Sequence, residues 1–152
     1  MKLNFIEKLI GSGFYSGFLP KAPGTYGSVV ALLFYLIPGF ENPTFLLTII
    51  SFFTIIGVGI GKKFESIYGK DPKQCTIDEM VGMWISLLFI PKKIWFILLA
   101  FVIWRVFDIY KPYPVNVAEK LDGGIGIMLD DIVAAIYTLI VTHIIIFILF
   151  RL

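Results

Sequence analysis

Long apolar runs separated by short charged segments dominate the pattern of this chain. The four longest runs are residues 22–40, 42–61, 80–104 and 132–150. Because about 20 apolar residues span the hydrocarbon of a bilayer, and fewer suffice where flanking residues reach the interface, we expect membrane helices in all four. Pro23 and Gly24 open the first run, so its helix is predicted to begin near Thr25.

The third run is interrupted in its middle by Pro91, Lys92 and Lys93. Two lysines at the bilayer centre would cost roughly 5 kcal/mol or more on insertion scales. We therefore predict a tight hairpin of two helices, at about 77–90 and 92–110, with the Pro-Lys-Lys turn at the far surface.

The hairpin determines which loops share a side of the membrane. With it, loops 11–24, 62–76 and 111–128 all lie on one side. That side holds a group of lysines, namely Lys21, Lys62, Lys63, Lys70, Lys73, Lys111 and Lys120. The positive-inside rule makes this side cytoplasmic, although Lys92 and Lys93 count against the rule.

The N-terminal residues 1–10 alternate charged and apolar positions at helical spacing, which predicts a short interfacial helix that ends at 11–13. The predicted fold class is all-α: a polytopic membrane helical bundle of about five short transmembrane helices plus this interfacial helix. A chain of 152 residues allows a single domain, 1–152, in which 11–152 form the bundle.

Composition supports a membrane protein. Apolar residues make up 58% of the chain and charged residues only 16%, against about 25% charged residues in soluble domains. The net charge of +2 is too small to indicate a nucleic-acid partner, and the single cysteine, Cys75, excludes an internal disulfide or a Cys-rich metal site.

Acidic residues gather at the edges of the apolar helices. Asp78-Glu79 and Asp130-Asp131 each form an acidic pair that we expect in the first turn of a helix, and Asp108 is a fifth acid. These acids either cap the helices and complement their dipoles, or bind a divalent cation. Two matching pairs favour the cation, and oxygen ligands alone suit Mg²⁺ better than zinc.

Basic residues accompany these acids. Arg105, Asp108 and Lys111 are spaced i, i+3, i+6. Either Arg105 and Asp108 neutralise each other within the bundle, or Arg105 or Lys111 binds phosphate oxygens while Asp108 orients them or binds metal. Lys21 and Thr25 lie in a Pro- and Gly-rich stretch that leads into a helix, where backbone N–H groups and the lysine can cradle an anion.

Four motifs in order resemble the phosphatidylglycerophosphatase A family, Mg²⁺-dependent membrane phosphatases of bacterial phospholipid synthesis. They occupy residues 16–27, 78–84, 105–114 and 123–134. Ala135 and Asp122 depart from the usual pattern without removing a ligand.

The resemblance implies that the chain removes the terminal phosphate of phosphatidylglycerophosphate at the cytoplasmic face of the bacterial inner membrane. The hypothesis assigns Asp78, Glu79, Asp130 and Asp131 as Mg²⁺ ligands. Asp108 is a further ligand or the base, so that Asp78, Asp108 and Asp130 are the catalytic candidates. Lys21, Thr25, Arg105 and Lys111 are the candidates for binding the substrate phosphate. We favour attack by water, since the chain lacks the Asp-x-Asp signature of aspartate-nucleophile phosphatases.

Two other functions stay open. A CDP-alcohol phosphotransferase also uses Mg²⁺ and aspartates, but Asp122-Gly123 is not followed by its Ala-Arg pair. A non-catalytic divalent-cation transporter would place acids near mid-span rather than at helix entrances. Gly57, Gly59 and Gly61 are spaced to support helix contacts within the chain or in a homo-oligomer.

Overall fold

The computed structural model describes residues 2–150, and this part of the chain contains helices and no strand. The elements are α1 (Phe5–Gly11), the short 3-10 helix η1 (Ser16–Phe18), α2 (Pro23–Leu36), α3 (Pro43–Tyr68), α4 (Ile77–Ser86), α5 (Ile94–Tyr110), α6 (Val115–Ala118) and α7 (Gly123–Phe150). The predicted all-α class is confirmed.

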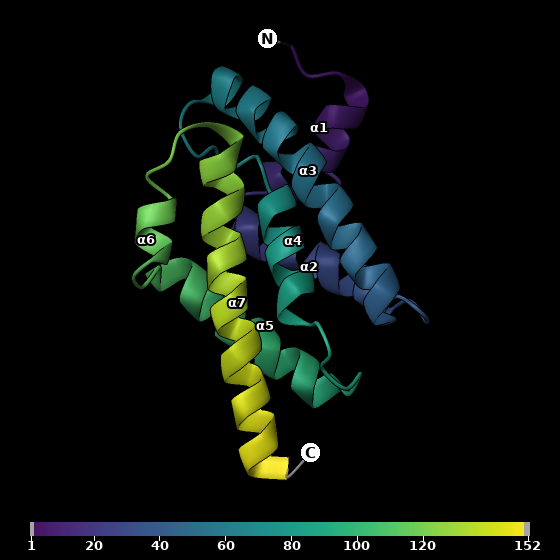
Figure 1. Cartoon of the computed structure of the whole chain (residues 1–152). Coiled ribbons are helices and arrows are strands. Elements are labelled where there is room, and N and C mark those ends of the chain that lie inside the picture. The colour runs from purple at the N-terminus through teal and green to yellow at the C-terminus, as the bar shows by residue number, and fades with distance from the viewer. Residues whose placement is uncertain (1, 151–152) are drawn as a thin grey trace.

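The short helix α4 lies at the centre of the molecule. The long helices α3 and α7 run lengthwise beside it, and α5 crosses behind α7 (Figure 1). Every residue of α4 except Glu79 is buried, because α2, α3, α5 and α7 all pack on it. A helix enclosed on all sides holds its polar residues in fixed positions, and Asp78 and Glu79 are in its first turn.

Two buried tryptophans tie α2 to its neighbours. The indole N–H of Trp84 donates to the Ala31 carbonyl at 3.0 Å, and that of Trp104 donates to Ser28 Oγ at 3.0 Å. Gly82 makes room for the Trp104 ring, since a Cβ at Gly82 would lie 2.3 Å from a ring carbon. These contacts fix the middle of α2 against α4 and α5.

The predicted helix break at Pro91, Lys92 and Lys93 is confirmed, because α4 ends at Ser86 and α5 begins at Ile94. The Lys92 ammonium donates to the Glu41 carboxylate at 2.8 Å and to the Ile37 carbonyl at 2.9 Å. The turn is therefore fastened to the loop that connects α2 with α3.

Several predicted boundaries were wrong, and α4 ends at Ser86 rather than at about 90. Helix α7 begins at Gly123 rather than at 132, and α3 continues past 61 to Tyr68. The glycines at 123–126, which fall in the predicted loop 111–128, instead belong to α7 and allow close helix packing. A Cβ on Gly124 would lie 1.8 Å from the Val58 carbonyl oxygen of α3. The extension of α3 carries Lys63, which forms an ion pair with Glu7 of α1.

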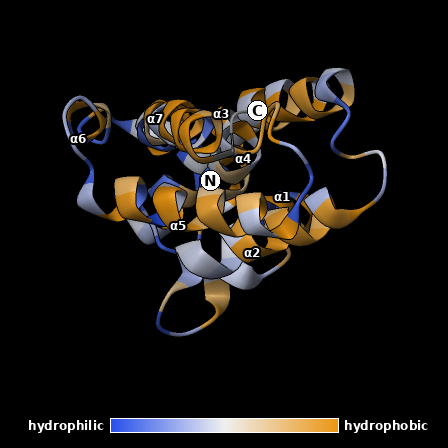
Figure 2. Ribbon diagram, turned by 90° about the horizontal axis from the view of Figure 1, so that it is seen from below, coloured by the Kyte–Doolittle hydropathy of each residue, from blue (hydrophilic) through white to orange (hydrophobic). Residues whose placement is uncertain are grey.

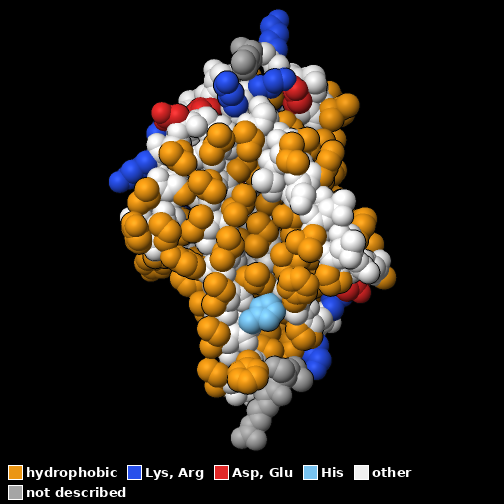
Figure 3. Space-filling model, viewed as in Figure 1, with side chains coloured by type: hydrophobic (Ala, Val, Ile, Leu, Met, Phe, Trp, Pro, Cys, Tyr) orange, Lys and Arg blue, Asp and Glu red, His pale blue; other side chains and the backbone are white. Residues whose placement is uncertain are grey.

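Among residues 2–150, two helices, α3 and α7, are long and apolar enough to cross a membrane. Helix α4, with 10 residues, is only about 15 Å long, so five full crossings remain a prediction. Apolar residues dominate the helices in the view of Figure 2, and Figure 3 shows a wide apolar belt with charged side chains mainly at one end and a few near the other.

Candidate active site

Three carboxylates from distant parts of the chain converge between α4 and α7. Oxygen atoms of Asp78, Glu79 and Asp131 all lie within 4.8 Å of one another. We call these three residues the carboxylate cluster. Asp78 and Glu79 are in the first turn of α4, as predicted, but Asp131 lies well inside α7, whose first turn holds no acid. N-terminal capping therefore does not explain the acids of α7.

The carboxylate cluster is short of hydrogen-bond donors. Asp78 Oδ1 accepts the backbone N–H of Glu79 at 3.0 Å, whereas Glu79 Oε2 and Asp131 Oδ2 are buried without a hydrogen-bond partner. Buried polar atoms normally have partners, and carboxylates packed this closely repel one another. Three converging carboxylates, two of which have an unpaired oxygen, fit a hard cation such as Mg²⁺.

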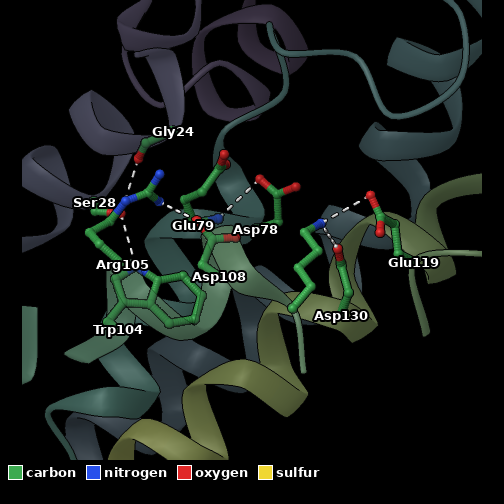
Figure 4. A network of polar contacts seen from close by, with 10 residues as sticks. Gly24, Ser28, Asp78, Glu79, Trp104, Arg105, Asp108, Glu119 and Asp130 are labelled. Carbon is green, nitrogen blue, oxygen red and sulfur yellow. Dashed lines mark hydrogen bonds and ion pairs between the residues drawn. The ribbon is translucent and has the colours of Figure 1, made fainter. Parts of the chain in front are cut away.

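Asp130 points to a different partner. Lys111, which caps the C-terminus of α5, donates to Asp130 Oδ2 at 2.6 Å and lies 3.4 Å from Glu119 (Figure 4). Burial alone would lower the pKa of Lys111, but the bond to Asp130 and the nearby carboxylates raise the pKa above its ordinary value. Of the four expected Mg²⁺ ligands, three meet in the carboxylate cluster and Asp130 binds Lys111.

Arg105 and Asp108 form an ion pair one turn apart on α5, with only 16% and 12% of their side chains exposed. Figure 4 shows this pair on one side of Asp78 and Glu79, and Asp130 with Glu119 on the other. Arg105 Nε is buried without a hydrogen-bond partner. A guanidinium with unused donor capacity is suited to bind an anion.

A cavity of about 330 Å³ joins the predicted cationic and acidic groups. We call it the site cavity. Its lining includes Lys21, Thr25, Asp78, Glu79 and Arg105. Three of the four expected phosphate-binding residues therefore line the cavity with two members of the carboxylate cluster. Lys111 is not among the lining residues.

Further residues of the site cavity were not predicted as site residues. Lys73 and Asp71 line it, although the charge pattern of the loops predicts only a role in topology for Lys73. Gly24 lies so close to Glu79 that a Cβ would be 2.4 Å from Oε1. The signal that could have found Lys73 is its position five residues before Asp78. Cys75 also lines the cavity but is buried, and burial raises the pKa of its thiol.

Comparison with known proteins connects this geometry to an enzyme family. The model of the family phosphatidylglycerophosphatase A matches residues 9–146. A Haemophilus influenzae protein named "Phosphatidylglycerophosphatase A" is 38% identical over 137 residues, which cover 88% of this chain and 84% of that protein. Its Escherichia coli namesake is 34% identical over 139 residues, covering 90% and 81%.

A Bacteroides thetaiotaomicron protein named "Putative phosphatidylinositol-3-phosphatase" is 41% identical over 145 residues, covering 90% of this chain and 91% of that protein. No solved structure matches the chain. The family match spans most of the chain, including all four motifs singled out in the sequence. The chain therefore belongs to the phosphatidylglycerophosphatase A family of phosphatases.

Proposed function

We propose that this protein hydrolyses the terminal phosphate of phosphatidylglycerophosphate in a Mg²⁺-dependent reaction, giving phosphatidylglycerol and inorganic phosphate. One observation carries the proposal: in a chain of this family, two members of the carboxylate cluster line the same cavity as Arg105 and Lys21. The relatives from Haemophilus influenzae and Escherichia coli carry the name of this activity.

Asp78, Glu79 and Asp131 would hold the cation. Glu79 Oε2 and Asp131 Oδ2, which are buried without hydrogen-bond partners, support this assignment, because a cation would satisfy both. When bound, Mg²⁺ polarises phosphoryl oxygens and lowers the pKa of a coordinated water. Asp130 would support the site from outside it, through its bond to Lys111.

Arg105 would hold the oxygens of the terminal phosphate, and Lys21, which lines the same cavity, would add positive charge for binding the substrate. Asp108 pairs with Arg105 and so orients its guanidinium toward the site cavity. In the reaction, a water oxygen bonds to phosphorus and the phosphorus–oxygen bond to glycerol breaks. The water gives up a proton, and the departing glycerol oxygen takes one up. Fixed positive charge at Arg105 favours the transition state, in which negative charge spreads over the phosphoryl oxygens.

We infer that the protein lies in the membrane as a multi-pass helical bundle with the site cavity on the cytoplasmic side. The apolar belt of Figure 3 and the lengths of α3 and α7 support this placement. A maleimide that cannot cross membranes tests it in a Cys75→Ser background. The introduced cysteines of Lys93→Cys and Asp122→Cys should be labelled from opposite sides of sealed vesicles. Labelling of both from the same side would contradict five crossings.

A second substrate is favoured by the 41% identical relative, whose name refers to the 3-phosphate of phosphatidylinositol. Both lipids carry a phosphomonoester beyond the phosphodiester of the headgroup. The site cavity offers the same cationic groups to either one.

Phosphate release from a headgroup panel tests the proposal on the full chain in detergent. The panel contains phosphatidylglycerophosphate, phosphatidylinositol 3-phosphate and phosphatidic acid, each with Mg²⁺ and with EDTA. Asp78→Asn and Asp131→Asn should each lower activity at least roughly 100-fold. Asp122→Asn is the control, because Asp122 forms only an exposed ion pair with Lys70.

Activity that survives EDTA would contradict the metal assignment. Release of phosphate from none of the lipids would favour the cation transporter, and consumption of a CDP-linked lipid with glycerol 3-phosphate would favour the phosphotransferase.

A further inference from the structure

Two lysines without partners stand at the outer part of the site cavity. Lys21 precedes α2 and Lys73 lies in the loop between α3 and α4, and both are exposed and line the cavity. Neither side chain forms an ion pair or hydrogen bond with another of residues 2–150. By contrast, Lys63, Lys70, Lys92 and Lys111 all pair with carboxylates.

The loop that carries Lys73 is held firmly in place. The Thr76 N–H donates to the Gly11 carbonyl at 2.8 Å, and its hydroxyl lies 3.2 Å from Ser16 Oγ. Gly17 packs directly on the loop, since a Cβ there would be 2.2 Å from the Gln74 carbonyl oxygen. Lys73 therefore projects from a fixed backbone rather than from a loose turn.

The cations of the site cavity lie at two depths. Arg105 is largely buried, with 16% of its side chain exposed, and it lies beside Glu79 of the carboxylate cluster. Lys21 and Lys73 are exposed and mark the outer part. Asp71 is the acidic residue of this outer part, and it also lines a separate small cavity with Glu65, Glu119 and Asp130.

We propose that Lys73, together with Lys21, binds a second phosphate group of the substrate: the phosphodiester that joins the headgroup to diacylglycerol. This inference rests on the proposed function and deepens it, because it names the structural basis of substrate choice. The terminal phosphate enters the inner part beside Arg105, and the phosphodiester remains at the outer part. Phosphatidic acid has one phosphate and no phosphodiester, so it leaves Lys73 without a partner.

The test compares phosphatidylglycerophosphate with phosphatidic acid of the same acyl chains in mixed micelles. Lys73→Ala should lower kcat/KM for phosphatidylglycerophosphate at least roughly tenfold, as expected for loss of a charged hydrogen bond. It should leave kcat/KM for phosphatidic acid within about twofold. Lys73→Arg should restore most of the loss.

Lys62→Ala is the matched control, because Lys62 is exposed and lies outside the cavity lining. It reports the general effect of one fewer surface charge.

Product inhibition gives a second readout. Phosphatidylglycerol keeps the phosphodiester and lacks the terminal phosphate, so Lys73→Ala should raise its inhibition constant while Lys62→Ala does not. An equal loss on both substrates, or no loss on phosphatidylglycerophosphate, would overturn the inference and leave the proposed function intact. If the wild type prefers phosphatidylinositol 3-phosphate, the same comparison applies, since that lipid also has a phosphodiester. Wild-type protein that releases phosphate from none of these lipids overturns the proposed function and this inference together.

Discussion

The ammonium of Lys111 donates a 2.6 Å hydrogen bond to the carboxylate of Asp130, the residue next to Asp131 of the carboxylate cluster. This bond connects the end of α5 with α7. Because Asp130 has only 5% of its side chain exposed, Lys111 is its main source of charge compensation. Lys111 therefore fixes the part of α7 from which Asp131 reaches Asp78 and Glu79.

Lys111→Met should destabilise the protein by about 1–3 kcal/mol, because it leaves a buried carboxylate without its donor. A lower thermal unfolding midpoint in detergent measures the effect. The double variant Lys111→Met/Asp130→Asn removes both charges and should recover most of the loss. If the loss of unfolding free energy in the double variant equals the sum of the losses in the two single variants, the two residues do not interact as described.

Mg²⁺ should raise the thermal unfolding midpoint of the wild type. Binding to the folded state stabilises by about 2.7 kcal/mol at a concentration 100 times the dissociation constant. Asp131→Asn should abolish this shift, yet in EDTA it should be no less stable than the wild type, since it relieves repulsion within the carboxylate cluster. Asp122→Asn should keep the full shift, and a wild type that shows none would exclude the site.

Gly24→Ala should impair the reaction more than it impairs folding. The new Cβ would lie 2.4 Å from Glu79 Oε1, the end of a flexible side chain that can move away. Displacing this carboxylate should lower kcat/KM roughly 10- to 100-fold, while the unfolding midpoint changes little. Gly59→Ala is the control, since its Cβ meets nothing within 4 Å and alanine favours a helix. Full activity in Gly24→Ala would remove Glu79 from the site.

Features of the fold that depend on strong local sequence signals could be predicted. Proline and paired lysines at 91–93 broke the third apolar run, and the helix break lies there. The glycine-rich start of α7 could not be predicted as helix, because local propensity favours a turn. Its helical form depends on contact between Gly124 and the α3 backbone, which exists only in the folded protein.

The sequence also could not separate the roles of Asp130 and Asp131. Neighbouring residues on a helix point about 100° apart, so one of the two lies closer to α4 than the other. Which one does depends on the rotation of α7, and this is set by packing on α3, α4 and α5. Asp131 faces the carboxylate cluster and Asp130 faces Lys111.

The ion pair between Glu41 and Lys92 should make stability depend on acid pH. The hydrogen bond from Lys92 holds the pKa of Glu41 below its ordinary value of 4.5. A lowered pKa in the folded state means that the stabilisation is complete above pH 4.5 and disappears as the pH falls through the lowered value. Glu41→Gln should therefore unfold at a lower temperature than the wild type at pH 7, and the difference should shrink below pH 4.5. Lys92→Met should behave in the same way, because it removes the other half of the pair. A difference that stays constant from pH 7 to acid would mean that Glu41 acts through packing rather than through its charge.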